Sequence, residues 1–135
     1  IALKEFSILY ILLKKNNLMQ NKLESIANLK FENELNNKIK NDILQQMTSD
    51  TFELKSFENK FQNEIKDIFS FANVRLILSK KNDQEVLIIF EELISDYNNS
   101  INSKKIESFE KKLLEKFDEN SYSELIKLKK QLNPE

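Results

Sequence analysis

Apolar residues recur along this chain at spacings of three and four, which is the period of an α-helix. The pattern is densest over residues 2–15, where one stripe runs along the segment and further apolar side chains lie around it: Leu3, Phe6, Ile8, Tyr10, Ile11, Leu12 and Leu13. A helix that is apolar on most faces is buried inside a domain. Residues 2–15 are therefore predicted to form the central helix of the fold.

The next two periodic segments predict further amphipathic helices. Asn17 and Gln20 have the spacing of a capping box that opens a short helix over residues 18–28. Residues 32–47 place apolar side chains four positions apart, so that they share one face. The members of this face are Leu35, Ile39, Ile43 and Met47.

Residues 48–51 are predicted to form a turn. Asp50, within this turn, and Glu53 have the spacing of a second capping box. The apolar positions that follow predict one helix that continues into the seventies. Residues 74–79 fit either a helix or a short strand. Because no partner strand is evident, we predict a helix there.

The clearest internal break is residues 80–83, where Asn82 and Glu85 form a third predicted capping box at the start of a long helix. Residues 98–103 are polar apart from Ile101. They are either a linker or a weak stretch within that long helix.

Two amphipathic segments close the chain, with a capping box predicted at Ser121 and Glu124 for the second of them. Helices joined by so short a turn run antiparallel. The predicted fold class is all-α: a helical bundle of four to five helices and then a C-terminal antiparallel helical hairpin. The bundle would occupy residues 1–101, with residues 83–101 as a connecting helix, and the hairpin residues 102–135.

The hairpin carries more apolar side chains than its seam can hide. The predicted seam consists of Ile106, Phe109, Leu113, Leu125, Leu128 and Leu132. Either the hairpin folds back on the bundle, or it offers the remaining apolar residues to a partner, since burying each large one is worth about 1.5–3 kcal/mol. The predicted partner-binding residues are Leu114, Phe117, Tyr122, Ile126 and Lys129.

Composition supports the helical prediction and excludes several kinds of site. Glycine is absent and Pro134 is the only proline, so a sheet with tight turns is not expected. The absence of His and Cys removes disulfides and most zinc sites, and it suits a reducing cytoplasm. Glu91, Glu92 and Asp96 form the one notable carboxylate cluster, which we interpret as a solvated helix face. No catalytic residue, cofactor or metal site is therefore predicted.

Charge and hydropathy restrict the classes of partner that are expected for this chain. The 21 basic and 22 acidic residues give a formal net charge of −1, and Lys and Glu interleave along the two C-terminal segments. Strong direct binding to nucleic acid is therefore not expected. The longest apolar run, residues 8–13, is too short for a membrane span. The chain begins with Ile1, so we expect it to be part of a longer protein.

The layout of the chain resembles a known family. Residues 5–13 (EFSILYILL) open it, short Asn-rich links follow, a long helix begins after Asn82, and residues 122–132 (YSELIKLKKQL) close it. Over the whole chain this pattern resembles the C-terminal domain of bacterial DNA primase of the DnaG type.

The resemblance implies a helical bundle followed by a hairpin. It also implies docking on the N-terminal domain of the hexameric replicative helicase, which brings primer synthesis to the fork. The hairpin would supply much of the affinity, and the bundle would modulate the helicase. The zinc-binding and polymerising parts of a nucleotidyltransferase would lie upstream, so this part would have no catalytic role.

Other functions remain open at this point. The helicase's own N-terminal domain has a similar bundle and hairpin. A helical surface or structural protein from an AT-rich bacterium fits the abundance of Lys, Asn, Ile and Phe. A weak nucleic-acid accessory domain and a carboxylate-based enzyme are the remaining alternatives.

Overall fold

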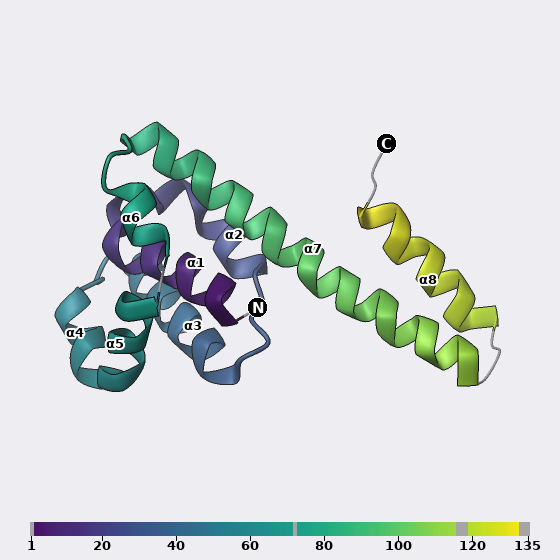
Figure 1. The fold of residues 1–135 in the computed structure, drawn as a ribbon. Coiled ribbons are helices and arrows are strands. Elements are labelled where there is room, and N and C mark those ends of the chain that lie inside the picture. The colour runs from purple at the N-terminus through teal and green to yellow at the C-terminus, as the bar shows by residue number, and fades with distance from the viewer. Residues whose placement is uncertain (1, 72, 116–118, 133–135) are drawn as a thin grey trace. The chain divides into compact units, whose positions relative to one another are not determined.

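A computed structural model describes residues 2–71, 73–115 and 119–132 of the chain (Figure 1). The side chains of residues 2, 71, 119–122 and 125 lie outside this description. Every regular element within the described ranges is helical, and no strand occurs among them. The all-α prediction is therefore confirmed.

The helices fall into two compact units, residues 1–94 and residues 95–135. Helix α7 begins in the first unit and ends in the second, and α8 belongs to the second. The α-helices are α1 (Ala2–Lys14), α2 (Leu23–Asn28), α3 (Glu34–Thr48), α4 (Leu54–Lys60), α5 (Gln62–Phe71), α6 (Val74–Leu78), α7 (Asp83–Glu115) and α8 (Glu119–Leu132).

Helix α1 is the buried centre of the first unit. Ile8, Leu9, Ile11 and Leu12 are completely shielded from solvent. The helix contacts α3, α5 and α6, and Figure 1 shows it enclosed by them. The prediction of a central N-terminal helix is confirmed.

A buried carboxylate fastens α1 to the start of α3. Glu5 is 1% exposed. Its two carboxylate oxygens accept hydrogen bonds from the backbone N–H of Glu32 at 2.9 Å and from Asn36 Nδ2 at 2.8 Å. These bonds offset the cost of removing the polar group from water. The Asn33 side chain caps α3 by accepting from the Asn36 N–H at 2.9 Å.

The buried face of α3 is more polar than predicted. Ile39, Ile43 and Met47 are buried as expected, but Leu35 is 40% exposed, so its predicted inward position is wrong. Asn36 and Lys40 share the buried face instead. The hydrogen bonds around Glu5 require Asn36 to face inward, and this rotates the neighbouring Leu35 toward solvent.

Lys40 is 2% exposed, and its ammonium group donates to the carbonyl of Leu29. Burial, and secondarily the positive charge of Lys30, lower the pKa of Lys40 below its ordinary value of 10.5. The Lys40 side-chain nitrogen thus lies inside the first unit with a backbone carbonyl as its partner.

The predicted helix over residues 18–28 is only partly present. Two short 3-10 turns, Asn16–Leu18 and Gln20–Lys22, precede α2. The capping box at Asn17 and Gln20 is wrong, because α2 begins at Leu23 without a side-chain cap. Met19, which lies between the two turns, is completely buried, so this irregular segment is anchored in the core.

The single helix predicted from Leu54 into the seventies is also wrong. It breaks at Phe61, whose φ of −121° and ψ of 50° leave the helical region, so that α4 and α5 are separate. The Phe57 and Phe61 rings stack with their centroids 6.3 Å apart, and both are buried. Packing of these rings in the core accompanies the bend.

The capping box predicted at Asp50 and Glu53 does not form. Asp50 adopts a positive φ of 53°, a left-handed conformation that Asp tolerates in a turn. Glu53 occupies the N-cap of α4 without a side-chain hydrogen bond. Its N–H donates to Gln46 Oε1 at 3.3 Å, which links the turn back to α3.

The start of α7 agrees with the prediction. The Asn82 N–H donates to Glu85 Oε1 at 3.2 Å, and the Glu85 N–H donates to Asn82 Oδ1 at 2.9 Å. This reciprocal pair is the predicted capping box. Residues 74–79 contain α6, so the choice of helix over strand is confirmed as well.

Residues 98–103 are helical within α7, which decides between the two readings of that stretch. Helix α8 spans Glu119–Leu132. The capping box predicted at Ser121 and Glu124 depends on the side chain of Ser121, which lies outside the described residues. The boundary between the two compact units falls between residues 94 and 95, within α7.

Helix α1 provides the first test of this packing. Replacing Leu12 by Ala is expected to lower the free energy of unfolding by about 2–5 kcal/mol, because it leaves a cavity in a completely buried site. Leu3→Ala, on the same helix but at a side chain that is 54% exposed, is the matched control and should change stability by less than about 0.5 kcal/mol. Urea denaturation of both variants measures this. Equal losses would contradict the central position of α1.

A second test concerns Lys40. Because folding lowers its pKa, the cost of burying the ammonium group is fully present below the lowered pKa and is relieved as pH rises toward 10.5. Between neutral pH and about pH 10 the wild-type chain should therefore gain stability relative to Lys40→Met. Lys38→Met, at an exposed position of α3, is the control and should follow the wild type in pH dependence. Parallel curves for Lys40→Met and wild type would refute the interpretation.

Candidate docking surface on α7 and α8

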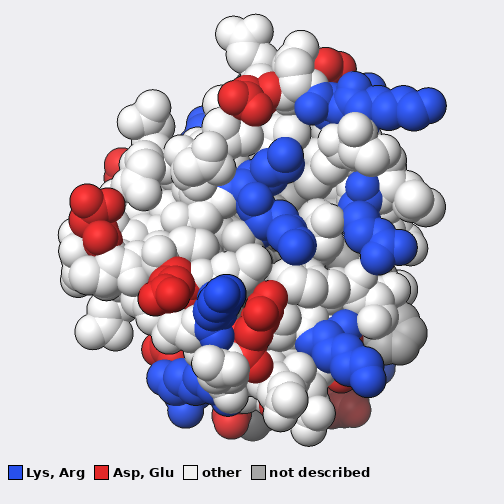
Figure 2. All heavy atoms as spheres, turned by 90° about the vertical axis from the view of Figure 1, so that its left-hand side faces the viewer, with Lys and Arg blue, Asp and Glu red and all other residues white. Residues whose placement is uncertain are grey.

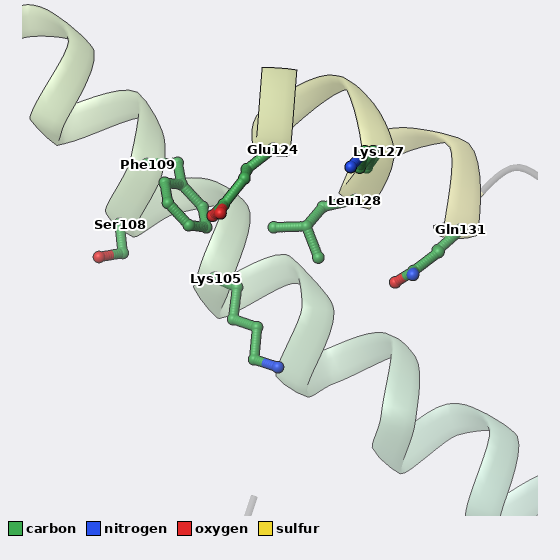
Figure 3. A pocket seen from close by; sticks show the side chains of 7 residues that line it. All are labelled: Lys105, Ser108, Phe109, Glu124, Lys127, Leu128 and Gln131. Carbon is green, nitrogen blue, oxygen red and sulfur yellow. The ribbon is translucent and has the colours of Figure 1, made fainter. Parts of the chain in front are cut away.

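A groove runs between α7 and α8 in the second unit (Figure 3). Its volume is about 510 Å³. Helix α7 contributes Lys105, Ser108 and Phe109, and α8 contributes Glu124, Lys127, Leu128 and Gln131. Figure 3 shows Phe109 and Leu128 pointing toward one another across the groove, with polar side chains around them. The groove thus has an apolar floor and a charged rim.

The apolar seam between the two helices is only partly closed. Ile106 is 8% exposed and therefore buried. The other described seam residues remain half-buried: Phe109, Leu113, Leu128 and Leu132. Two helices alone do not enclose the seam between them, so part of it stays open to solvent. Phe109 and Leu128 line the groove at such a part.

Charged groups flank the seam. Lys129 Nζ lies 3.6 Å from Glu110 Oε1, with both side chains about half exposed, so this pair contributes at most about 1 kcal/mol. The Lys112 ammonium lies 5.3 Å from the centroid of the Phe109 ring. These contacts orient the charged side chains at the edge of the groove and contribute little to the stability of the helix pair.

The predicted partner-binding residues that the structure describes are not among the residues that line the groove. Leu114 is 88% exposed and Ile126 is 38% exposed, and neither lines the groove. Lys129 pairs with Glu110. Phe117 and the side chain of Tyr122 lie outside the described residues. A role for these five residues in binding stays a prediction.

Phe109 and Leu128 were assigned by sequence to filling the seam and not to binding. The signal that could have identified them is geometric: a pair of helices without a third leaves its seam residues accessible along one side. Counting the helices available to cover each apolar face would have marked these residues as candidates.

The carboxylates singled out in the sequence lie at exposed positions of α7, as the interpretation of a solvated helix face predicts. Glu91 pairs with Lys22, with 2.6 Å between carboxylate oxygen and ammonium nitrogen, and Glu92 and Asp96 are exposed. Within residues 2–71, 73–115 and 119–132, no three acidic side chains come together as a metal site. None of the helices in these ranges is both long and apolar enough to cross a membrane.

The arrangement on α7 and α8 therefore offers apolar contact and charge pairing to a partner. Known proteins give no independent guide to it: no family model matches this chain, and neither a curated protein nor a solved structure matches it significantly.

Proposed function

We propose that this chain is a non-catalytic protein-interaction domain that docks through α7 and α8. In this proposal the two helices form an antiparallel hairpin that follows a helical bundle. The observation that carries the proposal is the half-buried seam around Phe109 and Leu128. A partner helix laid into the groove would complete the burial that two helices leave unfinished.

The energetics favour a helix as the occupant. Isolated short helices gain their stability from packing an apolar face, so an open seam is a site where a third helix gains burial at once. Full burial of a large apolar side chain contributes about 1.5–3 kcal/mol. Phe109 and Leu128 would form the centre, Leu114 and Ile126 would be further anchors at exposed positions outside the groove, and the charged rim would orient the partner.

We further propose that the partner is the N-terminal domain of a replicative helicase. The support is the resemblance of the chain to the primase C-terminal domain, in which a hairpin follows a helical bundle and supplies much of the affinity. In this role the chain would couple primer synthesis to the replication fork in the cytoplasm. A groove that accepts a helix is compatible with a helicase domain that is itself helical.

The exposed anchors give a direct test. The double variant Leu114→Asp, Ile126→Asp is expected to weaken binding to the helicase N-terminal domain by at least about tenfold, because charged groups would replace apolar contacts. Its melting temperature should change little, since both side chains are exposed already. The matched control is Leu76→Asp, at a side chain that is 77% exposed in the first unit, and it should bind as wild type does. Calorimetric titration measures both variants.

Truncation gives a second, independent test. A chain that ends at Asn102 keeps the first unit and the completely buried Tyr97, and it lacks the groove. We expect it to unfold cooperatively, as followed by circular dichroism, and to show no binding to the helicase domain. Binding retained by this folded chain would refute docking through α7 and α8. Absence of binding by the full chain would point instead to a surface or structural role.

A further inference from the structure

The first unit contains a hollow of about 370 Å³ beside the C-terminal end of α1. Four basic side chains line it: Lys14, Lys15, Arg75 and Lys81. They come from three separate segments, the end of α1, helix α6 and the turn before α7. No carboxylate is among the lining residues. This hollow belongs to residues 1–94 and is independent of the proposed function.

For two of the four cations, no acidic partner occurs among the residues that the structure describes. Within residues 2–71, 73–115 and 119–132, neither Lys15 nor Arg75 forms an ion pair. The Lys14 ammonium lies 4.7 Å from the centroid of the Phe69 ring. Lys81 lies 3.5 Å from Glu85, in an exposed pair that leaves much of its charge available. The hollow is therefore a concentration of positive charge in a chain with a net charge of −1.

Helix electrostatics account for only part of this arrangement. Cations near the C-terminal end of a helix are favoured by its dipole, which explains Lys14 and Lys15 at the end of α1. The dipole of α1 does not require Arg75 or Lys81, which lie about sixty residues later in the chain. Arg75 is also the only arginine in the sequence. Bringing four cations together is repulsive unless an anion joins them.

We propose that this hollow binds a compact polyanion that carries two or more linked phosphate groups. The planar Arg75 guanidinium can donate two parallel hydrogen bonds to one phosphate, and the lysines supply point charges around it. The Ser79 hydroxyl already donates to the Leu76 carbonyl at 2.8 Å, so recognition rests on the cations. A volume of about 370 Å³ is within the range of small-molecule sites.

The surroundings favour a compact ligand over a macromolecule. The apolar lining consists of Tyr10, 9% exposed, and Leu78, 5% exposed, which leaves little surface to anchor an acidic peptide. On the face drawn in Figure 2, basic side chains are separated by uncharged surface and flanked by acidic ones. An extended nucleic-acid backbone would need an unbroken basic band.

Titration of the full chain with inorganic triphosphate tests the proposal. Calorimetry at low salt should show binding to the wild type that weakens as salt is added. Arg75→Gln should lower the affinity by at least about tenfold, which corresponds to the loss of one charge-assisted contact. Arg75→Lys should retain part of it, because it keeps the charge without the planar fork. Lys55→Gln, at an exposed position of α4, removes the same charge elsewhere and should bind as wild type does.

Three outcomes would overturn the proposal. One is the absence of triphosphate binding at low salt, and another is an equal loss in Arg75→Gln and Lys55→Gln, which would indicate diffuse attraction only. The third is tighter binding, dependent on Arg75, of single-stranded DNA or of an acidic peptide at matched salt. Thermal melts verify that each variant is folded, and Lys15→Gln provides a second variant within the hollow.

Discussion

The apolar surface on all sides of α1 is the constraint on which the first unit depends. Ile8, Leu9, Ile11 and Leu12 are completely buried, so other helices must cover the cylinder from several directions. Helices α3, α5 and α6 provide that cover. Burial on this scale supplies the stability of a unit that has neither disulfides nor cysteines.

Polar contacts at the helix ends then determine how the covering helices are joined. Glu5 receives hydrogen bonds from the residues at the start of α3, and Lys40 donates to the carbonyl of Leu29 just before it. Asn82 and Glu85 define where α7 begins. Each contact gives a hydrogen-bond partner to a polar group at a helix end or inside the first unit. These contacts therefore specify one arrangement of the helices among the many that an apolar core allows.

The fold class and the central helix could be predicted from the sequence, because the helical spacing of apolar residues and the absence of glycine act on local backbone conformation. The sequence was insufficient where long-range contacts decide. Leu35 turns outward because Asn36 must reach Glu5, thirty-one residues away, and the chain bends at Phe61 where two rings pack in the core. Predicting the groove would have required knowing which seam residues stay half-buried. Predicting the basic hollow would have required knowing that Lys15 and Arg75, which belong to separate segments, line the same hollow.

In the proposed function, a helix of another protein completes the seam between α7 and α8. Amide hydrogen exchange of the full chain, with and without the helicase N-terminal domain, measures this most directly. We expect slower exchange in the partner's presence over residues 105–114 of α7 and 124–131 of α8, with residues 2–71 unchanged. Protection confined to residues 2–71, or no protection anywhere at saturating partner, would contradict it.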